Sequence, residues 1–234
     1  NVTGVQTCAL PISYSIFGGS IVLEGSTLNA RQFATQGSRE KMAAQIFTGT
    51  EHFRSGASKV TKDTPEPYKK VQSWLQVSYQ NETYHKVSPK FTLGAYLEAY
   101  YSSRNFSNNY TATLMQAGEF TPTAHSKVTY NEAFRANQYA GVGAMPIYQL
   151  SESFQLRGEF YGFVPIFPIK KDEYGQAYYG KAFTKFEYLG EISLVFQLSF
   201  GSISAYVNHY SSPSNDWNVG LTLGWQLFNS RFIE

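Results

Sequence analysis

The sequence predicts an all-β protein: an antiparallel transmembrane β-barrel, present as a C-terminal portion of about nine strands and therefore incomplete or open. Three observations indicate this fold. Apolar and polar residues alternate along most of the chain, which is typical of strands with one apolar and one polar face. Several of these segments exceed the usual strand length of about 5–6 residues and reach the roughly 9–11 that cross a bilayer. Their connections alternate between short and long, as in outer-membrane barrels.

The composition excludes several other classes of protein. Aromatic residues make up 17% of the 234 residues, and charged residues only 15%, against about a quarter in an average soluble domain. The net charge of +2 is too small to favour a nucleic-acid partner. Cys8 is the only cysteine, which excludes disulfide frameworks and zinc ribbons. The longest apolar run, Tyr161 to Ile169, contains two prolines and is far shorter than the roughly 20 residues of a spanning helix.

The strand-like segments follow one another along the whole chain. An odd number of them fits an incomplete barrel, because bacterial single-chain barrels have even numbers of strands. The segments lie near 13–27, 38–50, 70–85, 90–104, 136–149, 152–168, 181–199, 202–210 and 217–228.

The lengths of the connections between these segments predict how the barrel is oriented in the membrane. Short turns are expected at 85–90, 150–151 and 200–201, and the connection around Arg31 to Gly37 falls where another short turn is expected. Long polar connections are expected at 51–69, 105–135, 169–180 and 211–216. If the last strand ends at the periplasm, the long connections lie outside the cell. The 105–135 connection either folds into the lumen, binds a partner or remains a solvated outer loop.

The clearest alternation runs from Phe186 to Phe200, where the even positions are mostly apolar and the odd positions carry Glu187 and Glu191. We expect the apolar side chains to face lipid. The wet faces of two adjacent strands would then place Arg157, Glu159, Glu187 and Glu191 in the lumen, either as ion pairs that stiffen the barrel or as a selectivity filter. Aromatic residues near the strand ends predict an interfacial girdle: Tyr188, Phe200, Trp217 and Trp225.

The stretch from Asn218 to Trp225, within the last predicted strand, resembles the C-terminal signal by which outer-membrane barrels are recognised for insertion. Asn218, Gly220, Leu223 and Trp225 would fill its polar, glycine, hydrophobic and aromatic positions. An exposed edge with a small glycine can template pairing with an edge strand of the barrel-assembly machinery. Any amphipathic final strand approximates this signal.

Longer runs carry a family resemblance. FTLGAYLEAYYSSRNFSNNYTATLMQAGEFTP, YLGEISLVFQLSFGSISAYVNHYS and WNVGLTLGWQLFNSRFIE resemble the C-terminal barrel of Bacteroidetes-type patatin-like phospholipases, as does the passage from Thr27 to Phe33 followed by Gly37. These barrels are similar to the surface-antigen domain of outer-membrane assembly factors. The resemblance implies a bacterial outer-membrane location, with outer-membrane lipid and the assembly machinery as partners. The resemblance leaves open whether the protein forms a homodimer.

The resemblance implies no catalytic residue in this chain. In that family an N-terminal patatin domain carries a Ser–Asp dyad, with the serine in a G-x-S-x-G elbow. The nearest match, Gly18 to Val22, lacks the closing glycine. We therefore expect no enzymatic activity and no cofactor here. His52, His85, His125 and His209 have no metal-ligand spacing and are expected to be loop or girdle histidines.

Residues 1–12 are expected to lie outside the barrel. Val2 to Ile12 reads VTGVQTCALPI, which resembles the in-frame translation of a common short-read sequencing adapter; the alternative is an irregular N-terminal loop. Residues 13–234 would then form the barrel portion, anchoring and helping to export a patatin-like lipid acyl hydrolase domain absent from the chain. The alternatives are a porin-like channel without an enzymatic domain and a soluble β-rich binding protein whose apolar faces turn inward.

Overall fold

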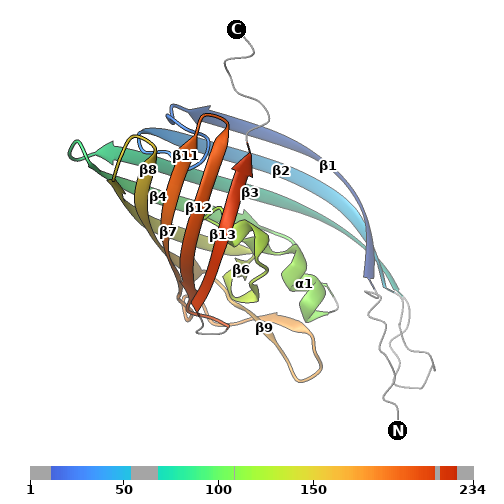
Figure 1. Ribbon diagram of the computed structural model, residues 1–234. Helices are drawn as coiled ribbons and strands as arrows, with labels where there is room; N and C mark the ends of the chain where they lie inside the picture. The colour runs from blue at the N-terminus through green and yellow to red at the C-terminus, as the bar shows by residue number, and fades with distance from the viewer. Residues whose placement is uncertain (1–11, 54–67, 108, 214–216, 226–234) are drawn as a thin grey trace.

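A computed structural model describes residues 12–53, 68–107, 109–213 and 217–225 of the chain (Figure 1). Within these residues the predicted all-β fold is confirmed: nine strands form one antiparallel sheet in the order β1-β2-β3-β4-β7-β8-β11-β12-β13. The sheet is open, with β1 and β13 at its two edges. Its strands are β1 (Ile12–Ser26), β2 (Gly37–Phe53), β3 (Tyr68–Lys86), β4 (Phe91–Ser102), β7 (Gln138–Gln149), β8 (Phe154–Pro165), β11 (Glu187–Leu198), β12 (Gly201–Tyr210) and β13 (Trp217–Trp225).

The smaller elements lie in the connections between these strands. The β4–β7 connection holds α1 (Tyr110–Gln116), β5 (Gly118–Glu119), the 3-10 turns η1 (Ser126–Val128) and η2 (Glu132–Phe134), and β6 (Arg135–Ala136); the β8–β11 connection holds the hairpin of β9 (Ile169–Lys171) and β10 (Ala177–Tyr179). Among the described residues, no helix has both the length and the apolar character needed to cross a membrane.

Each of the nine predicted segments corresponds to one strand, and the differences lie at the strand ends. The largest is at β11, which begins at Glu187 rather than near 181. Phe183 breaks the extended backbone there with φ = 54°, and its amide donates to the Ile166 carbonyl at 2.9 Å. This contact ties the end of the long connection back to β8.

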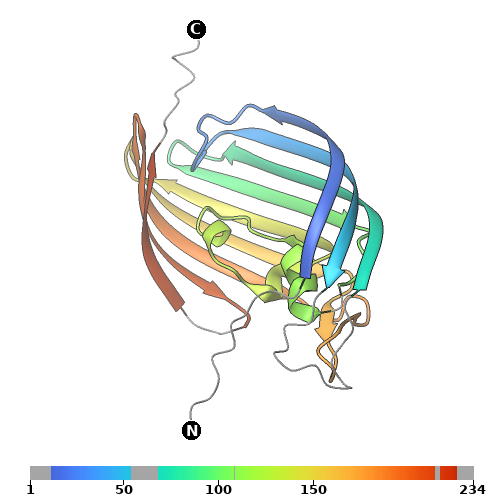
Figure 2. The ribbon, with the colours of Figure 1, turned by 90° about the vertical axis from the view of Figure 1, so that its right-hand side faces the viewer.

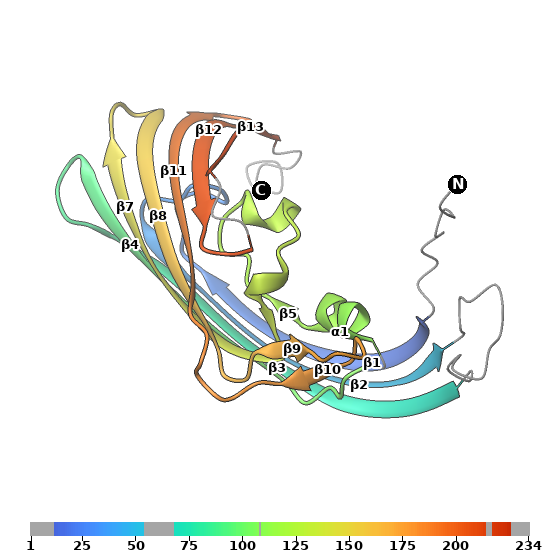
Figure 3. The same cartoon turned by 90° about the horizontal axis from the view of Figure 1, so that it is seen from below.

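Polarity alternates along the strands so that the inner, concave face holds the buried charged and polar side chains together with an aromatic cluster, whereas the outer face is mostly apolar. On β11, Glu187, Glu191 and Ser193 are buried, whereas Ile192 and Leu194 are exposed on the opposite face. Figures 2 and 3 show the sheet curling around the β4–β7 connection. In a two-layer sandwich, by contrast, the apolar side chains that are exposed here on the outer face would pack between the two layers.

The β4–β7 connection, residues 103–107 and 109–137, packs against the concave face and is called the plug below. Phe120 stacks on Phe163 with ring centroids 5.5 Å apart, and Phe134 meets both Phe163 and Tyr210. Of the alternatives left open for this connection, the structure agrees with the one in which it folds inward, and it differs from a solvated outer loop. The physical reason is that these rings find an aromatic surface on the inner face, with Gly141 leaving space for Phe120.

At the start of the plug, the guanidinium of Arg104 forms cation–π contacts with two aromatic rings. The Arg104 guanidinium lies 4.2 Å from the Trp74 ring centroid and 5.1 Å from that of Tyr14. Burial lowers the pKa of Arg104, and contacts with aromatic faces partly offset this loss of hydration.

A second segment enters the concave space from the opposite end of the strands. Residues 27–36, called the turn loop below, connect β1 to β2 where a short turn is expected. Ala34 is buried, and Phe33 has φ = 54°. Gln155 on β8 donates to the Phe33 carbonyl at 3.2 Å, so a connection at one edge of the sheet reaches a strand five positions from β1 in the sheet order.

Candidate functional site

The centre of the concave face is a buried ionic cluster around Arg157 on β8. Its Nε donates to Glu159 Oε1 at 2.5 Å, its Nη2 to the Tyr84 hydroxyl at 2.7 Å, and its Nη1 to the Ala34 carbonyl at 2.9 Å. Arg157 and Glu159 share a face because they are two residues apart on one strand. The guanidinium therefore joins its own strand, β3 and the turn loop.

A second carboxylate, Glu191, lies beside the first. Glu191 on β11 is the register partner of Glu159 on β8. Its Oε1 is 2.6 Å from His125 Nδ1, and its Oε2 accepts from Asn208 Nδ2 at 3.4 Å. His125 comes from the plug, so this hydrogen bond joins the plug to the wall of the sheet.

The other nitrogen of His125 faces β12. Nε2 lies 3.3 Å from Ser204 Oγ, and the imidazole stacks on the Tyr206 ring with centroids 3.6 Å apart. The order carboxylate, imidazole, hydroxyl resembles a nucleophile with its base and orienting acid. Ser204 is only 1% exposed, so a substrate cannot reach its hydroxyl in this arrangement. The geometry supports a structural role in holding the plug.

A third buried carboxylate stabilises the start of β7. Glu98 on β4 accepts from the Tyr139 hydroxyl at 2.6 Å and from the Tyr96 hydroxyl at 2.5 Å. Tyr139 also donates to the Glu119 carbonyl in the plug at 3.1 Å. The wall and the plug therefore share hydrogen bonds as well as aromatic contacts.

The structure brings three of the four expected inner-face charges together. Arg157, Glu159 and Glu191 form the cluster just described. Glu187 is also buried on the inner face, but it lies at the end of β11, 3.2 Å from Lys185 Nζ and hydrogen-bonded to Ser211. Within the described ranges, no group of three or more His, Cys, Asp or Glu side chains could hold a metal ion.

The four expected girdle residues lie near strand ends. Tyr188 and Trp217 are exposed and lie on either side of His209, at 5.9 and 4.9 Å between ring centroids. Phe200 lies exposed in the β11–β12 turn at the other end of the strands. Trp225 is the last residue of β13, and its side chain lies outside the described part of the structure.

The residues of the expected assembly signal lie on the edge strand β13. Asn218 and Gly220 pair in register with Asn208 and Tyr206 of β12, and Leu223 pairs with Ile203. Leu223 is exposed. On its other side β13 has no strand partner among the described residues.

Sequence reasoning missed His125, Tyr84 and the turn loop as parts of the site. Tyr84 has the parity of the inner face on β3, so the alternation of that strand contains a signal for it. His125 and the turn loop lie in connections, where no periodicity places a side chain. His125, expected to be a loop or girdle histidine, is a buried histidine of the plug.

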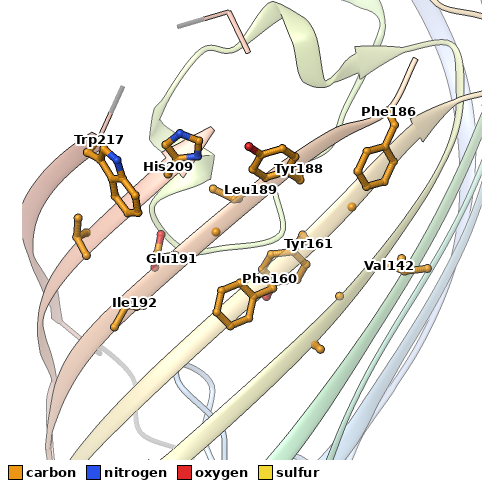
Figure 4. A pocket seen from close by; sticks show the side chains of 15 residues that line it. Val142, Phe160, Tyr161, Phe186, Tyr188, Leu189, Glu191, Ile192, His209 and Trp217 are labelled. Carbon is orange, nitrogen blue, oxygen red and sulfur yellow. The ribbon is translucent and has the colours of Figure 1, made fainter. Parts of the chain in front are cut away.

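The outer face carries an apolar hollow of about 810 Å³ over β7, β8 and β11 (Figure 4). Phe160, Phe186, Tyr188 and Trp217 line it, together with Gly162 and Gly190. The glycines deepen the surface because they carry no side chain between the larger groups. Glu191 is also among the lining residues, although its carboxylate contacts His125 on the concave side.

Fold and site together define a class of structure: a curled antiparallel sheet with an apolar exterior, a charged interior and two inserted connections that occupy that interior. Comparison with known proteins finds no matching family model, no matching curated protein and no matching solved structure.

Proposed function

We propose that the chain forms part of the wall of a β-barrel in the bacterial outer membrane. The observation that carries this proposal is the reversed polarity of the sheet. Large apolar side chains such as Phe17, Ile46 and Leu221 are at least 64% exposed, while the carboxylates face inward. An apolar face of this extent is unfavourable in water and favourable against lipid tails. In a bilayer the edges β1 and β13 need pairing with further strands, because unpaired backbone groups are costly there.

Within the membrane, the proposed role is to anchor, and help export, a patatin-like lipid acyl hydrolase domain. The resemblance of the strand sequences to patatin-associated barrels supports this role. The filled interior favours an anchor over the alternative, a porin-like channel with no enzymatic domain, because the plug and the turn loop occupy space that a channel would leave to water. The upstream reading frame of the gene distinguishes these two hypotheses. A patatin domain with a G-x-S-x-G motif there supports the anchor, and a signal peptide alone supports the channel.

Partitioning tests the membrane location. We expect the protein to remain in the membrane fraction after carbonate extraction and to migrate differently on gels before and after heating, because a folded barrel resists detergent until it is heated. A protein released freely into the aqueous fraction would contradict the proposal.

Conductance tests the anchor against the channel. In planar bilayers the protein is expected to show no steady porin-like current, because two inserted segments fill the interior. Replacing residues 105–135 with a short Gly-Ser linker should introduce a current. Equal, steady currents with and without the plug would instead support the channel.

A further inference from the structure

The two carboxylates at the centre of the concave face, those of Glu159 and Glu191, repel one another, and each needs a partner that offsets this repulsion. Glu159 and Glu191 are cross-strand partners, and both are almost fully buried. Like charges directly opposite one another destabilise a sheet, and buried charges repel more strongly than charges in water. Each carboxylate therefore depends on its own partner, Arg157 for Glu159 and His125 for Glu191.

These two partners also hold the two inserted segments. His125 belongs to the plug, which enters between β4 and β7. Arg157 belongs to the wall, but its Nη1 holds the turn loop through the Ala34 carbonyl. The pair of carboxylates is thus bonded directly to the plug through His125 and indirectly to the turn loop through Arg157, although the two segments enter from opposite ends of the strands.

We propose that the Glu159–Glu191 pair couples the plug to the turn loop. When the plug withdraws, His125 leaves and the Glu191 carboxylate loses its hydrogen bond to the imidazole. The guanidinium of Arg157, which pairs with the cross-strand neighbour Glu159, is then drawn toward both carboxylates and releases the Ala34 carbonyl. Loss of the plug therefore loosens the turn loop, so that the two ends of the interior open together.

Hydrogen exchange measured by mass spectrometry on the membrane-embedded protein tests this coupling. His125→Ala is expected to speed exchange about tenfold in both the plug and the turn loop, within the range of about 5–150-fold typical of coupled sites. Lys127→Ala is the matched control: it removes an exposed cation of the same plug segment and should leave both regions unchanged.

A second substitution separates charge coupling from simple loss of packing. Adding Glu191→Gln to His125→Ala removes the uncompensated charge, so exchange in the turn loop should return close to the wild-type rate while the plug stays loose. The proposal is overturned if the turn loop in His125→Ala exchanges as slowly as in Lys127→Ala, or if Glu191→Gln fails to restore it. Heat-modifiable migration confirms that each variant remains folded; if His125→Ala does not fold, His125→Gln takes its place with the same expected outcomes.

Discussion

Replacing Ile46 with arginine is expected to lower the free energy of unfolding in lipid vesicles by about 2–4 kcal/mol, the usual range for an arginine at the lipid face near the bilayer midplane. Ile46 lies in the middle of the 17-residue strand β2 and is 64% exposed on its outer face. The guanidinium would have to enter hydrocarbon or distort the bilayer to reach water. Urea titration of the vesicle-embedded protein, followed by tryptophan fluorescence, measures the change.

The neighbouring position provides the control. Gln45 lies on the opposite, inner face of β2, beside Gln76 in the sheet register, and is only partly buried. Gln45→Arg is therefore expected to change the free energy of unfolding by less than about 1 kcal/mol, as substitutions at accessible polar positions usually do. Equal effects of the two substitutions would show that the outer face does not meet lipid.

Replacing Arg157 with methionine is expected to lower the free energy of unfolding by about 3–5 kcal/mol, because breaking one side of a buried ion pair leaves the other charge uncompensated. Glu159 would lose the guanidinium that pairs with it, and the Tyr84 hydroxyl and the Ala34 carbonyl would lose their donor. The same urea titration measures this loss, and hydrogen exchange should increase most in the turn loop.

Two further variants test the cause of that loss. Arg39→Met removes an arginine that pairs with Glu24 at 3.1 Å but is partly exposed, so its effect should stay below about 1 kcal/mol. Adding Glu159→Gln to Arg157→Met removes the stranded charge and should recover a large part of the stability. If the double variant were no more stable than Arg157→Met, packing of the arginine stem rather than charge would be the cause.

The alternation of side chains was sufficient to predict the strands and their two faces. On a strand, neighbouring residues point to opposite sides, so the parity of Glu191 and Leu194 places them on different faces without knowledge of the rest of the chain. The strand at Phe186 to Phe200 could be identified for this reason, and so could the shared face of Arg157 and Glu159. The predicted first residue of this strand was less accurate, because the positive φ of Phe183 depends on a contact with the Ile166 backbone rather than on a local sequence pattern.

The contents of the interior could not be predicted in the same way. His125 and Glu191 are 66 residues apart, and Arg157 and Ala34 are 123 apart. Neither His125 nor Ala34 lies in a periodic segment. Their positions follow from the curvature of the sheet, which brings distant strands and both inserted connections around one buried space. Periodicity assigns a residue to one face of a strand because it is a local property of the backbone. The partner of a buried charge, by contrast, depends on which distant segments the fold brings within hydrogen-bond distance.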